Sequence, residues 1–152
     1  MWRILVIHGP NLNLLGVREK NVYGDTPFAA INEQIRSGAE KMGIYVEIFQ
    51  SNHEGEIIDR IHAALGKFDG LIINPGAYTH YSVAIRDAVA AVDIPTIEVH
   101  LSNVSSREDF RKESVIAPVC LGQISGLGPI SYLLGLSGIV MHLEASKCQK
   151  SN

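Results

Sequence analysis

The sequence predicts an α/β fold in which helices cover both faces of a parallel β-sheet, a three-layer sandwich. Short apolar runs of strand length alternate along the chain with amphipathic segments of helix length. Two of these runs, 4–7 and 71–73, are continuously apolar, which is typical of parallel strands buried on both faces. The 152 residues contain no composition break or low-complexity linker, so residues 1–152 are expected to form one domain.

Five apolar runs are expected to form the strands of this sheet. They lie at 4–7, 45–49, 71–73, 96–99 and 119–121. With the first strand in the centre, the expected strand order is 2-1-3-4-5, and strand order then reverses between the first and third strands. Ligands of open parallel sheets bind beside such a point, at the carboxyl ends of the strands.

Amphipathic segments between the runs predict four helices. They are expected at 27–42, 54–65, 80–91 and 130–143. The first helix has the clearest boundaries: Thr26 is a suitable N-cap, Pro27 suits the first helical position, and Gly43 is a typical stop signal.

The two later helices have unusual faces. The segment 80–91 carries an apolar stripe of Val83, Ala84, Ala88 and Ala91 that is interrupted by Asp87. The last helix begins after a proline and is apolar nearly all round, which indicates burial against the sheet and a neighbouring subunit. The tail after about residue 144 is polar and is expected to be poorly ordered.

Composition limits the kinds of partner that the chain is expected to bind. The net charge is −3 and no basic face is evident, which argues against nucleic acid or an acidic membrane surface as a partner. Charged residues make up only 19% of the chain, so part of the surface is expected to be hidden by self-association. The N-terminus lacks the pattern of a signal peptide, and no apolar run is long enough to span a bilayer. Cys120 and Cys148 lack Cys-x-x-Cys spacing and suit unpaired thiols in a reducing compartment, so a cytoplasmic location is expected.

Several common site types are absent from the sequence. No glycine-rich motif for dinucleotide or nucleoside triphosphate binding follows any strand, and Ser125 lacks the glycine that a nucleophile elbow requires. Four histidines follow predicted strands, namely His8, His53, His80 and His100, but no His-x-x-x-His or carboxylate spacing joins them into a metal site. Neither a metal nor a cofactor is therefore expected.

The polar residues that remain suggest proton-transfer chemistry. One loop after the first strand holds Asn11, Arg18 and Tyr23, which together suit an anion stabiliser, an activating cation and a base. A tyrosine is almost wholly protonated at neutral pH, and a neighbouring guanidinium favours its phenolate. His100 follows Glu98 by two residues, so both side chains should lie on one side of their strand, where the carboxylate can orient the imidazole.

These residues resemble the family of type II 3-dehydroquinate dehydratases. The similarity runs in order from residue 4 to about residue 136. It includes Gly9-Pro-Asn-Leu-Asn-Leu-Leu-Gly16, Arg18-Glu19, Tyr23-Gly24, Asn74-Pro-Gly-Ala-Tyr-Thr-His80, Ser82-Val-Ala-Ile-Arg-Asp87, Glu98-Val-His-Leu-Ser-Asn103, Arg107-Glu-Asp-Phe-Arg111, Gly122-Gln-Ile-Ser-Gly-Leu-Gly128 and Tyr132-Leu-Leu.

The resemblance implies a flavodoxin-like sheet and reversible dehydration of 3-dehydroquinate to 3-dehydroshikimate through an enolate, without a cofactor. By match to the family, Tyr23 is the base, with Arg18 beside it, and His100 is the acid that protonates the departing hydroxyl. Glu98 orients His100. Asn11 holds a water against the enolate oxygen, as an oxyanion-hole donor would.

The same resemblance implies the substrate-binding residues. Asn74 and the backbone amides of Leu101 and Ser102 match the residues that hold the substrate carboxylate, and His80 and Arg111 match those that bind the ring hydroxyls. The family assembles as a dodecamer of four trimers, in which the carboxylate matching Asp87 reaches the site of a neighbouring subunit. Residues 18–25 match a lid over the substrate.

Two other interpretations remain open. A flavodoxin-like binding module without catalytic activity would keep the crevice and hold a small acid or a flavin, although the first loop lacks the Ser/Thr-rich phosphate nest of flavodoxins. A metal-dependent lyase would lose its activity in the presence of a chelator. The direction of flux, shikimate synthesis or quinate breakdown, does not follow from the sequence.

Overall fold

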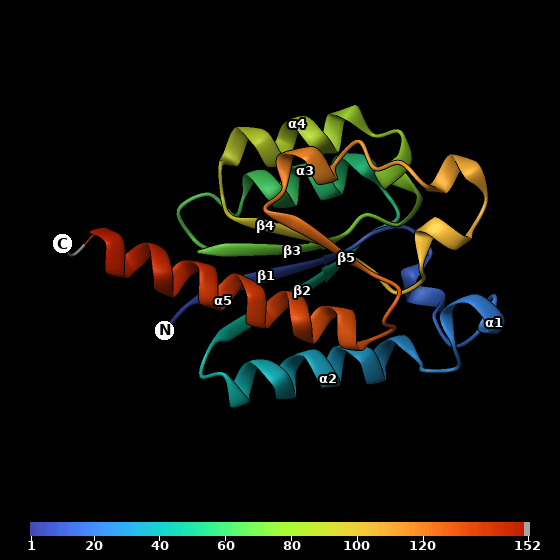
Figure 1. Cartoon of the computed structure of the whole chain (residues 1–152), viewed down its shortest axis with the longest axis horizontal. Coiled ribbons are helices and arrows are strands. Elements are labelled where there is room, and N and C mark those ends of the chain that lie inside the picture. The colour runs from blue at the N-terminus through green and yellow to red at the C-terminus, as the bar shows by residue number, and fades with distance from the viewer. Residues whose placement is uncertain (151–152) are drawn as a thin grey trace.

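A computed structural model describes residues 1–150, and a five-stranded sheet lies at its centre (Figure 1). The strands are β1 (Arg3–His8), β2 (Tyr45–Gln50), β3 (Gly70–Asn74), β4 (Thr96–His100) and β5 (Gly122–Ser125). Their order is β2-β1-β3-β4-β5, and every pair is parallel. The predicted α/β fold and strand order are therefore confirmed.

Helices cover both faces of the sheet, as Figure 1 shows, with α2 and α5 on one face and α3 and α4 on the other. The helices are α1 (Lys20–Tyr23), α2 (Phe28–Lys41), α3 (Glu54–His62), α4 (Val83–Val92) and α5 (Ile130–Lys150). Short 3-10 turns lie in the loops at Leu12–Leu14, Gly76–His80, Val104–Ser106, Asp109–Arg111 and Ala117–Val119. None of the helices within residues 1–150 is long and apolar enough to cross a membrane.

The buried strand β1 explains why its sequence is apolar without alternation. Ile4 and Val6 belong to the core under α2 and α5, whereas Leu5 and Ile7 belong to the core under α3 and α4. All four side chains are fully buried. Each such burial stabilises the fold by about 1.5–3 kcal/mol, so β1 fixes both helix layers to the sheet.

The fifth predicted strand was wrong in position. Residues 119–121 are not a strand, because Ala117–Val119 forms a 3-10 turn and β5 starts only at Gly122. In the turn, Val119 packs against the α3/α4 core, which explains the apolar signal. β5 is an edge strand with a half-exposed surface, and it therefore needs few apolar residues.

Several helix boundaries also differ from the prediction. Pro27, not Thr26, is the cap of α2, and no side chain caps this helix. The N-cap of α4 is Ser82, whose hydroxyl accepts a hydrogen bond of 3.0 Å from the Ile85 amide. α3 ends at His62 instead of residue 65. α5 continues through residues 144–150, where an irregular tail was expected, and residues 151–152 lie outside the described part of the chain.

The buried face of α4 is not the predicted stripe. The buried residues are Ile85, Ala88, Val89 and Val92. Of the predicted stripe only Ala88 is among them, and the members at 83, 84 and 91 are exposed. A helix rich in alanine and valine carries apolar residues on more than one face, so periodicity alone selects the wrong one. Asp87 is also exposed, because it lies on the face that α4 turns away from the sheet.

Candidate active site

A pocket opens at the carboxyl ends of β1, β3 and β4, where strand order reverses. The loops after β1 and β3 approach each other closely there. The Gly9 amide donates a 2.7 Å hydrogen bond to the Asn74 carbonyl, and a Cβ at Gly9 would lie 2.5 Å from the Pro75 carbonyl oxygen. Only glycine allows this approach, which holds the loops after β1 and β3 together beside the pocket.

The pocket brings together most of the residues that the sequence suggested. Nine of them line it: Asn11, Arg18, Tyr23, Asn74, His80, His100, Leu101, Ser102 and Arg111. Glu98 is fully buried behind His100. Asp87 is exposed on α4 and does not line the pocket of its own chain.

A strained backbone conformation places Asn11 at the pocket. Its φ of 67° lies in the left-handed region, which asparagine adopts more readily than most residues. The backbone N–H of Asn11 donates to Asn52 Oδ1 at 3.0 Å, and Gln50 Nε2 donates to the same oxygen at 3.1 Å. The residues after β2 therefore hold the loop after β1 in position.

Two arginines surround the hydroxyl of Tyr23. Arg107 donates to the phenolic oxygen at 2.7 Å, and Arg18 donates to it at 3.5 Å. The guanidinium carbons of Arg18 and Arg107 also lie 4.9 and 5.2 Å from the ring centroid. The Tyr23 oxygen therefore lies beside two positively charged groups, and Arg107 makes the shorter contact with it.

Arg107 is a site residue that the sequence analysis did not single out. It lies in the irregular segment between β4 and β5, where no periodic pattern marks a functional residue. Glu108 lies beside it and accepts a 2.7 Å hydrogen bond from Arg111, which draws both arginines to one side of the pocket. The quoted motif Arg107-Glu-Asp-Phe-Arg111 was the one signal for this residue.

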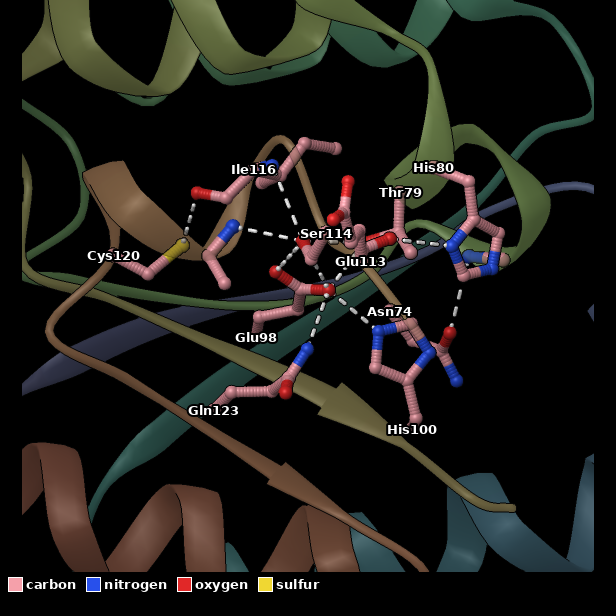
Figure 2. Close-up of polar contacts among 12 residues, drawn as sticks. Asn74, Thr79, His80, Glu98, His100, Glu113, Ser114, Ile116, Cys120 and Gln123 are labelled. Atoms are coloured by element: carbon pink, nitrogen blue, oxygen red, sulfur yellow. Dashed lines mark hydrogen bonds and ion pairs between the residues drawn. The ribbon is translucent and has the colours of Figure 1, made fainter. Parts of the chain in front are cut away.

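His100, which also lines the pocket, forms a buried pair with Glu98 (Figure 2). His100 Nε2 lies 2.5 Å from Glu98 Oε1, so the two side chains share one side of β4 as predicted. Because a carboxylate only accepts hydrogen bonds, Nε2 carries a proton. Figure 2 shows the other ring nitrogen on the opposite side of the ring from Glu98.

Three further side chains donate hydrogen bonds to Glu98. Thr79 donates to Oε1, Ser114 lies 3.0 and 2.9 Å from the two oxygens, and Gln123 lies 3.1 Å from Oε1 (Figure 2). Burial alone would raise the pKa of the Glu98 carboxyl. The hydrogen bonds, with that from His100 the strongest, hold this pKa below its usual value.

His80 and Asn74 are held by backbone contacts at the edge of the pocket. His80 Nδ1 lies 2.7 Å from the Glu113 carbonyl, which can only accept, so Nδ1 is the donor. Asn74 Oδ1 accepts from the Gly76 amide at 3.1 Å, and Asn74 Nδ2 donates to the Tyr132 hydroxyl at 3.0 Å. Both side chains are therefore oriented before any ligand binds.

The other histidines and the cysteines lie apart from this arrangement. His8 is fully buried beneath the pocket rather than at its rim, and His53 is exposed outside it. Among residues 1–150, no group of three or more His, Cys, Asp or Glu side chains is placed to hold a metal ion. Both cysteines are free, and burial raises the pKa of the Cys120 thiol to about 12.

Comparison with known proteins identifies the family. A family model described as dehydroquinase class II matches residues 2–140. The chain belongs to the class II dehydroquinase family. This confirms the family resemblance that the sequence motifs carried.

Individual relatives agree with the class II dehydroquinase assignment. The chain is 62% identical to a 3-dehydroquinate dehydratase of Nostoc sp. over 141 residues, which cover 93% of this chain and 96% of the relative. It is 63% identical to a 3-dehydroquinate dehydratase of Caldicellulosiruptor saccharolyticus over 90% of this chain and 94% of the relative. The crystal structure of a type II dehydroquinase from Butyrivibrio crossotus superposes with a TM-score of 0.90 at 53% identity, covering 91% of this chain and 97% of that one.

Proposed function

We propose that this class II dehydroquinase catalyses the reversible dehydration of 3-dehydroquinate to 3-dehydroshikimate. Family membership supports the reaction, and the observation that supports the mechanism is that one pocket holds both groups. Tyr23 lines it beside the guanidinium groups of Arg18 and Arg107, and His100, which is paired with Glu98, lines it too. This arrangement offers a base and an acid at the same time.

The proposed mechanism uses side chains and one bound water. The Tyr23 phenolate removes the proton next to the ketone, and the electrons of the broken C–H bond form an enolate. Asn11 holds a water that donates to the enolate oxygen, which stabilises the charge as it develops. When the enolate collapses, the carbon–oxygen bond of the leaving hydroxyl breaks, the His100 imidazolium donates its proton to that oxygen, and water departs.

Binding of the substrate is assigned to the remaining polar groups. Asn74 and the backbone amides of Leu101 and Ser102 hold the carboxylate, and His80 and Arg111 bind the ring hydroxyls. All five residues line the pocket. His80 and Arg111 fix which face of the ring Tyr23 attacks, and a reacting group held in this way gains much of its rate from orientation.

We also infer that the protein acts as a dodecamer of four trimers in the cytoplasm, in shikimate synthesis or quinate breakdown. Exposed apolar side chains on α5, Ile130, Leu134 and Met141, support burial against other subunits. Two free cysteines suit a reducing compartment.

The test is a spectroscopic assay of the purified protein with 3-dehydroquinate in the presence of a chelator. The conjugated enone of the product should appear and give an increasing ultraviolet absorbance. Tyr23→Phe should bind substrate and form no product above background, whereas Tyr45→Phe, an exposed tyrosine on β2, should react as the wild type does. Absence of product at high enzyme concentration would refute the proposal and favour a binding module. Loss of activity in the chelator would favour a metal-dependent lyase.

A further inference from the structure

Beneath the pocket, three buried polar side chains connect to Asn74. Asn32 Oδ1 lies 2.9 Å from His8 Nε2, His8 Nδ1 lies 2.7 Å from the Tyr132 hydroxyl, and Tyr132 in turn accepts from Asn74 Nδ2 at 3.0 Å. His8 and Tyr132 are fully inaccessible to solvent, and Asn32 is 9% exposed. The proposed mechanism uses none of these three residues, although a buried polar network of this kind is costly unless every member is satisfied.

The direction of each hydrogen bond in this chain follows from its two ends. The side-chain oxygen of Asn32 can only accept, so His8 Nε2 carries the ring proton and Nδ1 is left as an acceptor. Tyr132 therefore donates its hydroxyl proton to His8, and its oxygen accepts from Asn74 Nδ2. If the hydrogen bond at either end of this series were reversed, two donors or two acceptors would face each other.

The charge states support this direction. Burial lowers the pKa of His8 to about 4, so its imidazole is neutral at neutral pH. Burial also raises the pKa of the Tyr132 phenol, which keeps its proton. Within the described residues, the side chains recorded against His8 are Phe28 and Asn32 from α2 and Tyr132 from α5, and of these only Tyr132 titrates.

This series of hydrogen bonds ends at the pocket, at Asn74. Its Oδ1 is held by the Gly76 amide and its Nδ2 by Tyr132, so the amide group cannot turn over without losing both bonds. An amide NH₂ has two hydrogens, and only one is used by Tyr132. The other is available to a ligand in the pocket that Asn74 lines.

We propose that Asn32, His8 and Tyr132 form a directional relay that positions Asn74 with its NH₂ group toward the substrate carboxylate. The three residues are positioning residues, since none of them lines the pocket. The inference rests on the proposed function, because it takes the carboxylate of 3-dehydroquinate as the ligand of Asn74. It adds a determinant of substrate affinity on two helices, α2 and α5, that lie outside the loops of the site.

The first test removes the hydroxyl in the middle of the relay. The carboxylate does not change during dehydration, so Asn74 binds the substrate and the transition state equally well. Losing its orientation should raise KM and leave kcat nearly unchanged. We expect Tyr132→Phe to raise KM by about threefold to tenfold with kcat within about twofold. The matched control, Tyr45→Phe, should change neither constant.

The second test reverses the relay from its other end. Asn32→Asp gives His8 a carboxylate partner, which favours the imidazolium form. Nδ1 then becomes a donor to Tyr132, whose own proton must turn toward Asn74, where it meets the NH₂ group. Asn74 should turn over, and KM should rise at acidic pH and return toward the wild-type value as His8 loses its proton at alkaline pH. In the double variant with Tyr132→Phe, this pH dependence of KM should disappear.

The outcomes separate the two proposals. A wild-type protein without turnover refutes the proposed function and the relay with it. Turnover by the wild type together with an unchanged KM in a folded Tyr132→Phe variant refutes the relay alone, as does a fall in kcat at constant KM. If Tyr132→Phe does not fold, the Asn32→Asp variant alone tests the relay. If the KM of Asn32→Asp changes with pH in the same way as that of the wild type, the relay is refuted.

Discussion

The Tyr23 hydroxyl lies nearer to Arg107 than to Arg18, although the sequence suggested Arg18 as the activating cation. The 2.7 Å distance from Arg107 is that of a good hydrogen bond, whereas 3.5 Å from Arg18 is at the outer limit. Arg18 is also paired with Glu19, which neutralises part of its field. We therefore assign most of the stabilisation of the phenolate to Arg107.

Replacing the two arginines in turn tests this assignment. Arg107→Met should lower kcat by about tenfold to a hundredfold, because a hydrogen bond to a charged group contributes about 1.5–3 kcal/mol. Arg18→Met should lower kcat less. Arg36→Met, which removes an exposed arginine on α2, is the control and should leave kcat unchanged. Steady-state kinetics with 3-dehydroquinate gives all three values, and a larger loss in Arg18→Met than in Arg107→Met would contradict the assignment.

The buried His8 should make stability depend on pH. Its pKa is about 4 in the folded chain and near 6.5 when exposed. Between these values the unfolded chain binds one more proton, so the free energy of unfolding rises with pH in this window. The contribution of neutral His8 to the free energy of unfolding is complete above about pH 6.5 and is lost as the pH falls toward 4.

We expect the wild type to lose about 2 kcal/mol of unfolding free energy between about pH 7 and pH 5 through this residue. Denaturant titrations at the two pH values measure the loss. In His8→Gln the loss should be smaller by this amount, while the exposed histidines, such as His53 and His62, contribute equally to both proteins. Equal pH dependence in the two proteins would show that His8 is not buried in its neutral form.

The loop between β1 and α2 controls where Tyr23 lies. Tyr23 is the last residue of the one-turn helix α1, and Gly24 follows it with φ 80° and ψ −178°. Only glycine occupies this region without strain, and a side chain there costs about 1–3 kcal/mol. The glycine therefore fixes the direction in which the chain leaves Tyr23.

Gly24→Ala should lower turnover by displacing Tyr23 from Arg107. A Cβ at Gly24 meets no atom within 4 Å, so the strain is confined to the backbone. Gly66→Ala is a matched control, because Gly66 also has a positive φ of 71° and open space around it but lies after α3, away from the pocket. Both variants should lose thermal stability, and only Gly24→Ala should lose activity, by tenfold or more if about 1.4 kcal/mol of the strain reaches the transition state. Equal activities would exclude a role for the loop.

The sequence predicted the central elements better than the peripheral ones, for a physical reason. β1 and β3 are buried on both faces, so their composition has to be apolar, and they were found. β5 lies at the edge and α4 has apolar side chains on two faces, so packing constrains their sequences less. The sequence prediction therefore misplaced β5, and it took a mostly exposed face of α4 for the buried one.

The pocket as a whole was predictable because parallel strands end at one edge of the sheet. Asn11, Asn74 and His100 are far apart in sequence and meet there, as expected from topology. The support beneath them was not predictable. Nothing in the sequence indicates that His8 and Tyr132 would contact each other across 124 positions, since such pairs depend on how α5 packs against the sheet.

The exposed surface of α4 raises the question of what covers it. Val83 is 56% exposed, and Asp87 lies one turn further along the helix, outside the pocket of its own chain. The resemblance to the type II family implies that the carboxylate matching Asp87 reaches the site of a neighbouring subunit. If Asp87 completes the site of a neighbouring subunit, Asp87→Asn should nearly abolish activity although Asp87 does not line the pocket of its own chain.

Mixed assemblies separate this shared site from a local effect. Tyr23→Phe chains lack the proposed base and Asp87→Asn chains lack the carboxylate, so each variant alone should be nearly inactive. When the two are unfolded together and refolded as a one-to-one mixture, a site with Tyr23 from one chain and Asp87 from its neighbour forms with a chance of about one in four, if subunits mix at random. Activity should then rise to about a quarter of the wild-type value. If Asp87 acts within its own chain, no intact site can form, and the mixture should stay as inactive as its parts.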